Sequence, residues 1–243
     1  MTTQDGSQLK KTAKHSAIYA VGTAISRITG LVMLPIYTRY LTPDDYGVLA
    51  LLSMAIDLTA ILVGLRITQA MFRFYILEDD EHKKKVIVST VLHTIIATSS
   101  LGAAILYFGA QPLSVFIFGD PGYLYEFQLF AFTLVTNAIS AVGLAYLRIR
   151  QKPFLFVSIG AMTLALQVSL NVIFVVMLEM HVLGVVYGAL IAGVVVATGF
   201  CMYMLVNVCI HYSRAIATEL VKFVAPLIIA SIGAFYVAYA DKY

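Results

Sequence analysis

Arg27 is a cation in the middle of an apolar stretch, and this isolation makes it the first candidate for chemistry. It lies 13 residues after Lys14 and 12 before Arg39, with no Asp, Glu, Lys or Arg between them. On a helix that rises about 1.5 Å per residue, Arg27 would lie roughly 18 Å from either flanking charge, near the centre of a bilayer core about 30 Å thick. A lone guanidinium at that depth costs at least about 2.5 kcal/mol. The sequence therefore predicts that Arg27 either pairs with a carboxylate or faces a water-filled cavity that accepts an anion.

Asp57 and Arg66 are two further charges within apolar segments. Asp57 is expected at a depth similar to that of Arg27, where it is either the ion-pair partner of Arg27 or a proton- or sodium-linked carboxylate. Arg66 lies nearer to one membrane surface, so its side chain either extends to the lipid headgroups or lines the same cavity. Both pairs of interpretations stay open at this point.

Three amides form a second, neutral group of candidates: Asn137, Gln167 and Asn171. Gln167 and Asn171 are four residues apart and so share one helix face. Amides at membrane depth either form hydrogen bonds between helices or line a hydrophilic cavity. The sequence has no phosphate-binding loop, no nucleophile elbow and no metal-ligand spacing. We therefore expect no enzyme activity, no metal and no cofactor.

The segments that would hold these side chains are long and apolar. Hydrophobic residues make up 60% of the 243 residues and charged residues only 12%, about half the usual charged share. Four stretches have no Asp, Glu, Lys or Arg and are each long enough to span a membrane, which takes about 20 residues: Val86–Gly119, Phe127–Leu147, Pro153–Leu178 and Met180–Ser213. The composition predicts an all-α polytopic membrane protein.

Breaks rich in charge, proline and turn residues divide the chain into seven predicted spans. These are residues 15–38, 46–72, 86–109, 126–147, 154–178, 183–208 and 222–240. We expect the long second span to be one tilted helix, and PLSVFIFG after the third to be a short interfacial helix. With these spans, 12 of the Lys and Arg residues outside the apolar runs lie on the same side of the membrane as the N-terminus. Two, Arg39 and Lys242, lie on the opposite side. The positive-inside rule then predicts a cytoplasmic N-terminus.

The first 75 residues resemble bacterial polysaccharide-precursor flippases of the Wzx type, within the MATE-like (MOP) transporter superfamily. The resemblance is carried by a Ser-Arg-x-x-Gly element (Ser26, Arg27, Gly30), by RYLTP (39–43) followed by DDYG (44–47), and by a second span that ends in Arg73-Phe74. Residues 76–215 match in hydropathy and loop spacing. Peptidoglycan-precursor flippases typically have an Arg-Asp pair where this chain has LVMLP (31–35), which argues against that substrate.

The last stretch, ELVKFVAPLIIASIGAFYVAYADKY, resembles the start of the second lobe in the same family. The resemblance implies a cytoplasmic tail (1–13), a six-helix N-terminal lobe (14–210), an inter-lobe linker (211–221) and the first helix of a second lobe (222–243). A complete relative would be nearly twice as long, so we expect the sequence to be a fragment of a longer protein.

The function implied by the resemblance is transport of a polyprenyl-diphosphate-linked oligosaccharide across the bacterial cytoplasmic membrane, by rocking of two lobes. Arg27, with Arg66 as a second candidate, would contact the diphosphate, and Asn137, Gln167 and Asn171 would bind sugar hydroxyls. The partners would be this lipid-linked glycan, the bilayer and other polysaccharide-assembly proteins, and no nucleic acid. One alternative is a MATE-type cation-coupled drug exporter, which should have mainly acidic charges within the membrane. Another is a membrane enzyme, which would need a larger outer loop. The third is a non-transporting scaffold.

Overall fold

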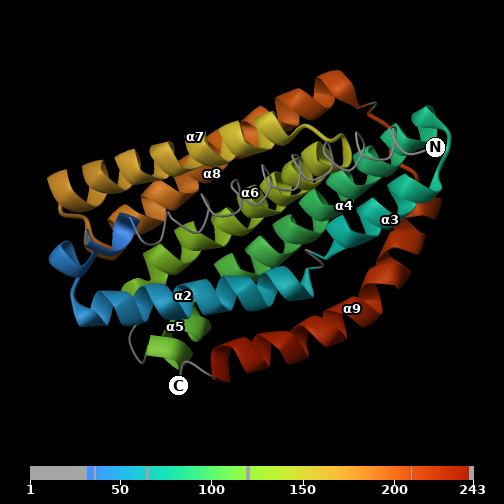
Figure 1. The fold of residues 1–243 in the computed structure, drawn as a ribbon. Helices are drawn as coiled ribbons and strands as arrows, with labels where there is room; N and C mark the ends of the chain where they lie inside the picture. The colour runs from blue at the N-terminus through green and yellow to red at the C-terminus, as the bar shows by residue number, and fades with distance from the viewer. Residues whose placement is uncertain (1–31, 36, 64–65, 119–120, 209, 241–243) are drawn as a thin grey trace.

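The computed structural model describes residues 32–35, 37–63, 66–118, 121–208 and 210–240. Within these ranges the regular secondary structure is helical throughout (Figure 1): α2 (Pro43–Leu62), α3 (Ile67–Leu77), α4 (Glu81–Phe108), α5 (Ala110–Phe118), a 3₁₀ turn (Pro121–Tyr123), α6 (Leu124–Ile149), α7 (Pro153–Asn171), a π-helix (Val172–Met177), α8 (His181–Asn207) and α9 (Arg214–Ala240). In this part of the chain, six segments are long and apolar enough to cross a membrane. The chain is a polytopic α-helical membrane protein. Most of the predicted span 15–38, including Arg27, lies outside the described residues.

Helix α6 is the centre of the bundle. It packs against α4 on one side and α8 on the other, with α7 beyond α8 and α9 along the opposite side (Figure 1). One apolar core joins α3, α4, α6 and α9 through residues such as Met71, Val91 and Leu220, and a second joins α2, α4, α6 and α8. The outward faces of α7 and α9 are rich in exposed apolar side chains, as expected for surfaces that contact lipid or other protein.

Short polar signals set where the helices begin. Helix α2 starts with a capping box, in which the backbone N–H of Asp45 donates to the Thr42 hydroxyl and the Asp45 carboxylate accepts from the Thr42 backbone N–H, with Pro43 in the first turn. Asp80 caps the start of α4, and its carboxylate accepts a 2.8 Å hydrogen bond from the His82 N–H. Prolines also open α7 and lie inside α9, at Pro226.

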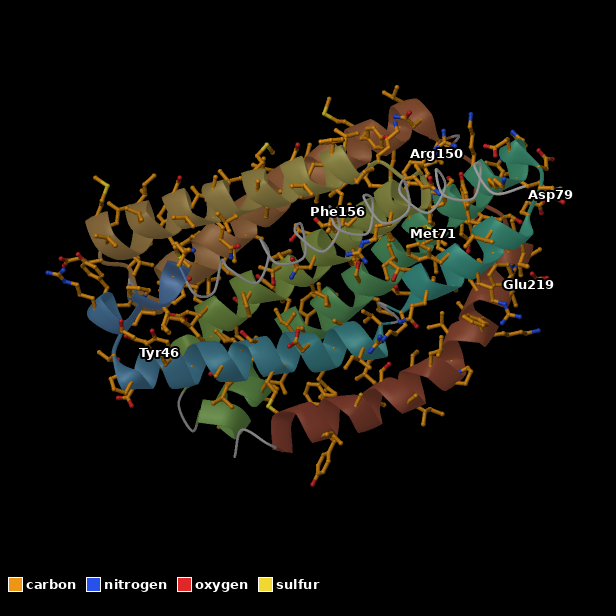
Figure 2. All side chains as sticks on the ribbon, viewed as in Figure 1. Tyr46, Met71, Asp79, Arg150, Phe156 and Glu219 are labelled. Atoms are coloured by element: carbon orange, nitrogen blue, oxygen red, sulfur yellow. The ribbon has the colours of Figure 1, made fainter. Side chains whose placement is uncertain are left out.

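Charged side chains gather at one end of the bundle, which we call the charged pole. Figure 2 shows Asp79, Arg150 and Glu219 at this end, although they come from the α3–α4 loop, the α6–α7 loop and α9, and shows Tyr46 toward the opposite end. The charged pole corresponds to the face that the positive-inside rule assigns to the cytoplasm.

Two predicted boundaries differ from the structure, and one local prediction is confirmed. The predicted single helix over residues 46–72 is divided into α2 and α3, with Val63 and Arg66 outside both helices. Helix α9 begins at Arg214 rather than near residue 222, because the Ser213 hydroxyl accepts from the Ile216 N–H and the polar first turns extend the apolar span. The short helix predicted at PLSVFIFG is present as α5.

Candidate functional site

A cavity of about 400 Å³ lies between α6, α7 and α8, and we call it the mid-bundle cavity. Its polar side chains come from two helices: Thr133, Asn137 and Ser140 from α6, and Thr163 and Gln167 from α7. Spacings of three and four residues put each set on one helix face. Helix α8 contributes small residues, including Gly193, which leave the space open.

The hydroxyl groups of the cavity donate to their own helices. Thr133 donates to the Phe130 carbonyl at 2.6 Å, Ser140 to the Thr136 carbonyl at 2.8 Å and Thr163 to the Ile159 carbonyl at 2.7 Å. A hydroxyl has one donor and two acceptor lone pairs, so these bonds leave acceptor sites on the oxygens. These hydroxyl groups thus present hydrogen-bond acceptors at membrane depth, while their own O–H donors are satisfied.

The two amides of the mid-bundle cavity supply donors as well as acceptors. The Asn137 side chain is exposed and that of Gln167 is half-buried, and among the described residues neither has a hydrogen-bond partner. None of the described residues that line the cavity carries a formal charge. The arrangement suits a neutral, hydroxyl-rich group, which can both donate to and accept from such a wall.

Asn171 is separated from this cavity. It is fully buried, and neither its amide nitrogen nor its amide oxygen has a hydrogen-bond partner. A β-carbon added to Gly188 of α8 would lie 3.0 Å from the Asn171 Oδ1, so Asn171 packs directly on this glycine. Although Gln167 and Asn171 are four residues apart on α7, Gln167 lines the cavity and Asn171 lies in the α7–α8 contact, where the π-helix begins.

The charged candidates lie apart from the described wall of the mid-bundle cavity. Arg66 is half-buried between α2 and α3, and its carbonyl accepts from the Gln69 N–H at 2.9 Å. Asp57 is on an exposed face of α2. Arg27 and its predicted pairing with Asp57 lie outside the described residues, so the anion-binding part of the site stays a prediction.

Sequence reasoning missed Thr133, Ser140 and Thr163 as cavity residues. Hydroxyl residues are common in apolar helices, and no hydropathy window separates a cavity threonine from one that packs. Their spacing from the two amides could have identified them: residues 133, 137 and 140 share one face of α6, and residues 163 and 167 share one face of α7.

The helical fold is similar to that of three solved structures. A MATE protein in complex with MaD3S is 18% identical with a TM-score of 0.71, and the match covers 92% of this chain and 55% of that protein. A MATE protein in complex with Br-NRF is 18% identical with a TM-score of 0.70, over 95% of this chain and 58% of that one. A MOP superfamily transporter from Pyrococcus furiosus Vc1 (DSM3638), described as having a binding pocket of reversed polarity, matches at 18% identity and a TM-score of 0.66, over 92% and 54%.

The fold is therefore similar to that of part of a MATE-type protein, with six segments among the described residues that are long and apolar enough to span a membrane. The chain spans just over half the length of the solved structures that it matches. Residues 36–243 match the family model described as polysaccharide biosynthesis protein. The chain belongs to this polysaccharide biosynthesis family. No curated protein matches the sequence.

Proposed function

We propose that this chain forms the N-terminal lobe of a flippase that moves a polyprenyl-diphosphate-linked oligosaccharide across the cytoplasmic membrane. The observation that carries the proposal is the mid-bundle cavity, a space of about 400 Å³ whose described polar lining is neutral and able to bind hydroxyl groups. Membership of the polysaccharide biosynthesis family supports a glycan as the cargo.

The chemical roles follow from the two parts of such a substrate. Asn137 and Gln167 would exchange hydrogen bonds with sugar hydroxyls, while the hydroxyl oxygens of Thr133, Ser140 and Thr163 accept from them. The diphosphate needs a cation because a bare anion is strongly disfavoured in hydrocarbon. Arg27 would supply that cation, with Arg66 as the second candidate, and Asp57 would hold Arg27 in place when no substrate is bound. Asn171 acts in this proposal through helix packing rather than by direct contact.

The experiment that tests the proposal is flipping of a fluorescent lipid-linked oligosaccharide by the full-length protein in vesicles. Replacing both Asn137 and Gln167 by Ala removes two cavity amides, and we expect flipping at low substrate concentration to fall about tenfold, since each lost hydrogen bond is worth about 0.5–1.5 kcal/mol. The matched control is Gln151→Ala, an exposed residue in the turn before α7. Equal rates for the double variant and the control would refute the glycan role of the cavity.

A second arm tests the cation. Arg27→Gln should abolish flipping of the diphosphate-linked substrate while Arg27→Lys retains part of it, because only the former removes the positive charge. Flipping at the parental rate by Arg27→Gln would refute a diphosphate contact at this residue. Efflux of a cationic dye by the same vesicles, with no flipping, would instead support the alternative of a drug exporter.

A further inference from the structure

A second hollow lies at the charged pole, away from the mid-bundle cavity, and we call it the pole pocket. It has a volume of about 220 Å³ and lies where the ends of α3, α4, α6 and α8 meet. Its lining residues are Tyr75 of α3, Glu81 and Lys85 of α4, Tyr146 of α6, Arg150 directly after α6, and Val206 and Asn207 of α8. Since one water takes a share of about 30 Å³ of liquid volume, the pole pocket has room for a phosphate-sized group. Figure 2 shows Arg150 at this end of the bundle.

Cations are in excess at the pole pocket. Glu81 is the acidic residue among its lining residues, and the Lys84 Nζ already lies 3.0 Å from the Glu81 Oε1. Lys85 and Arg150 both line the pocket, so two positive charges face a carboxylate that a third cation neutralises. Among the described residues no carboxylate lies within ion-pair distance of Lys85.

The guanidinium of Arg150 is only loosely held. Its Nη1 lies 3.5 Å from the Tyr75 hydroxyl and 3.7 Å from the Glu81 Oε2, and 44% of the side chain is exposed. Charge-assisted hydrogen bonds are ordinarily about 2.7–2.9 Å long. Both contacts use Nη1, so the pair of parallel N–H groups with which arginine binds a phosphate is not occupied by Glu81. The Tyr75 contact also raises the pKa of Arg150, which keeps the group charged.

The rim of the pole pocket identifies the form in which a phosphate would arrive. Val206 is 86% exposed and the neighbouring Leu205 is 60% exposed, both at the last turns of the apolar helix α8. A phosphate carried by a lipid would place its acyl chains against these side chains and bury their apolar surface. A free phosphate ion gains nothing from them.

We propose that the pole pocket binds the phosphate group of an anionic phospholipid, held by Lys85 and Arg150. The hydroxyl of Tyr75 is a further donor at the same pocket, and the lipid chains lie along Val206 and Leu205 of α8. The bound lipid would join the ends of α3, α4, α6 and α8, and so stabilise the charged pole. This site is independent of the proposed transport, because it shares no lining residue with the mid-bundle cavity.

The test is lipid retention by the full-length protein in native mass spectrometry, with phosphatidylglycerol or phosphatidylcholine added to detergent. We expect preferential retention of phosphatidylglycerol and a higher melting temperature in its presence. The double variant Lys85→Gln, Arg150→Gln should retain phosphatidylglycerol at least about tenfold less, since each cation near a lipid surface is worth a factor of about five in affinity. Lys85→Arg, Arg150→Lys should restore retention.

The matched control removes the same charge elsewhere at the charged pole, as Lys83→Gln, Lys222→Gln, two residues that do not line the pocket. Equal loss in the control would overturn the proposal by showing a diffuse attraction without a site. Parental retention by the Lys85→Gln, Arg150→Gln variant would overturn it as well. If inorganic phosphate in lipid-free detergent raises the melting temperature as much as phosphatidylglycerol does, the pocket binds a free anion and the lipid assignment is wrong.

Discussion

The mid-bundle cavity and the pole pocket lie in the same bundle but are built from different chemistry. The cavity has hydroxyls and amides, whereas the pole pocket has two cations, a carboxylate and two tyrosines. The cavity lies along the middle of α6 and α7, and the pole pocket at helix ends. The difference follows from the cost of charge in a membrane, which is several kcal/mol at the bilayer centre and close to zero at the headgroups.

The largest expected effect comes from moving a charge from one region to the other. Gln167→Arg puts a cation in the middle third of the α7 span, and we expect it to lower the free energy of unfolding by about 2.5–3.5 kcal/mol. Gln151→Arg puts the same side chain in an exposed turn at the charged pole, where we expect almost no change. Thermal unfolding of both variants in nanodiscs is the measurement. Equal melting temperatures would mean that the cavity is as well hydrated as the charged pole, and would contradict the claim that a charge costs more in the cavity.

A second prediction concerns the close contact between α6 and α8 beside the cavity. A β-carbon added to Gly193 would lie 2.5 Å from the Thr136 Oγ1, whereas one added to Gly199 of the same helix meets nothing within 4 Å. We expect Gly193→Ala to destabilise the protein by about 1–3 kcal/mol. Gly199→Ala should be neutral or stabilising by up to about 1 kcal/mol, because alanine is the better helix former. Denaturation of the two variants side by side checks this, and a milder Gly193 variant would show that α6 and α8 can separate.

The smallest effect is expected to be a gain in stability. Asn171→Leu removes a buried amide without partners and keeps a side chain branched at the γ-carbon, so we expect the free energy of unfolding to rise by about 1 kcal/mol. Asn137→Leu changes an exposed cavity amide, and stability should stay nearly constant. A destabilised Asn171→Leu protein would show that the amide has a partner in the membrane-embedded protein.

The sequence predicted the bundle well because charge and hydropathy alternate along it. Breaks such as LTPDD and RIRQKP combine cap residues, proline and charge, and they separate the described spans close to where the helices end. The start of α9 could not be found in this way, because RAIATELV is polar enough to look like a loop although it is helical.

The candidate site was predicted in part, and its local geometry explains the rest. Asn137 and Gln167 line the same cavity. Both were candidates in the sequence because they are amides within apolar segments. The different surroundings of Gln167 and Asn171 were not readable, because the two residues share a face of α7 but lie about 6 Å apart along its axis. Over that distance the neighbouring structure changes: Gln167 lines the cavity, whereas Asn171 packs on Gly188 of α8. The charged residues Arg27, Asp57 and Arg66 remain predictions.

The π-helix at Val172–Met177 has a consequence for how the length of α7 can change. A π-helical segment holds one more residue than an α-helix would need to close the same hydrogen bonds. Deleting a single residue there should therefore convert it to an α-helix while Gln167 and the turn into α8 keep their places. The same deletion three turns earlier would rotate the cavity face by about 100° against the rest of the bundle. Deletion of one residue is thus expected to be tolerated within the π-helix and to be disruptive earlier in α7.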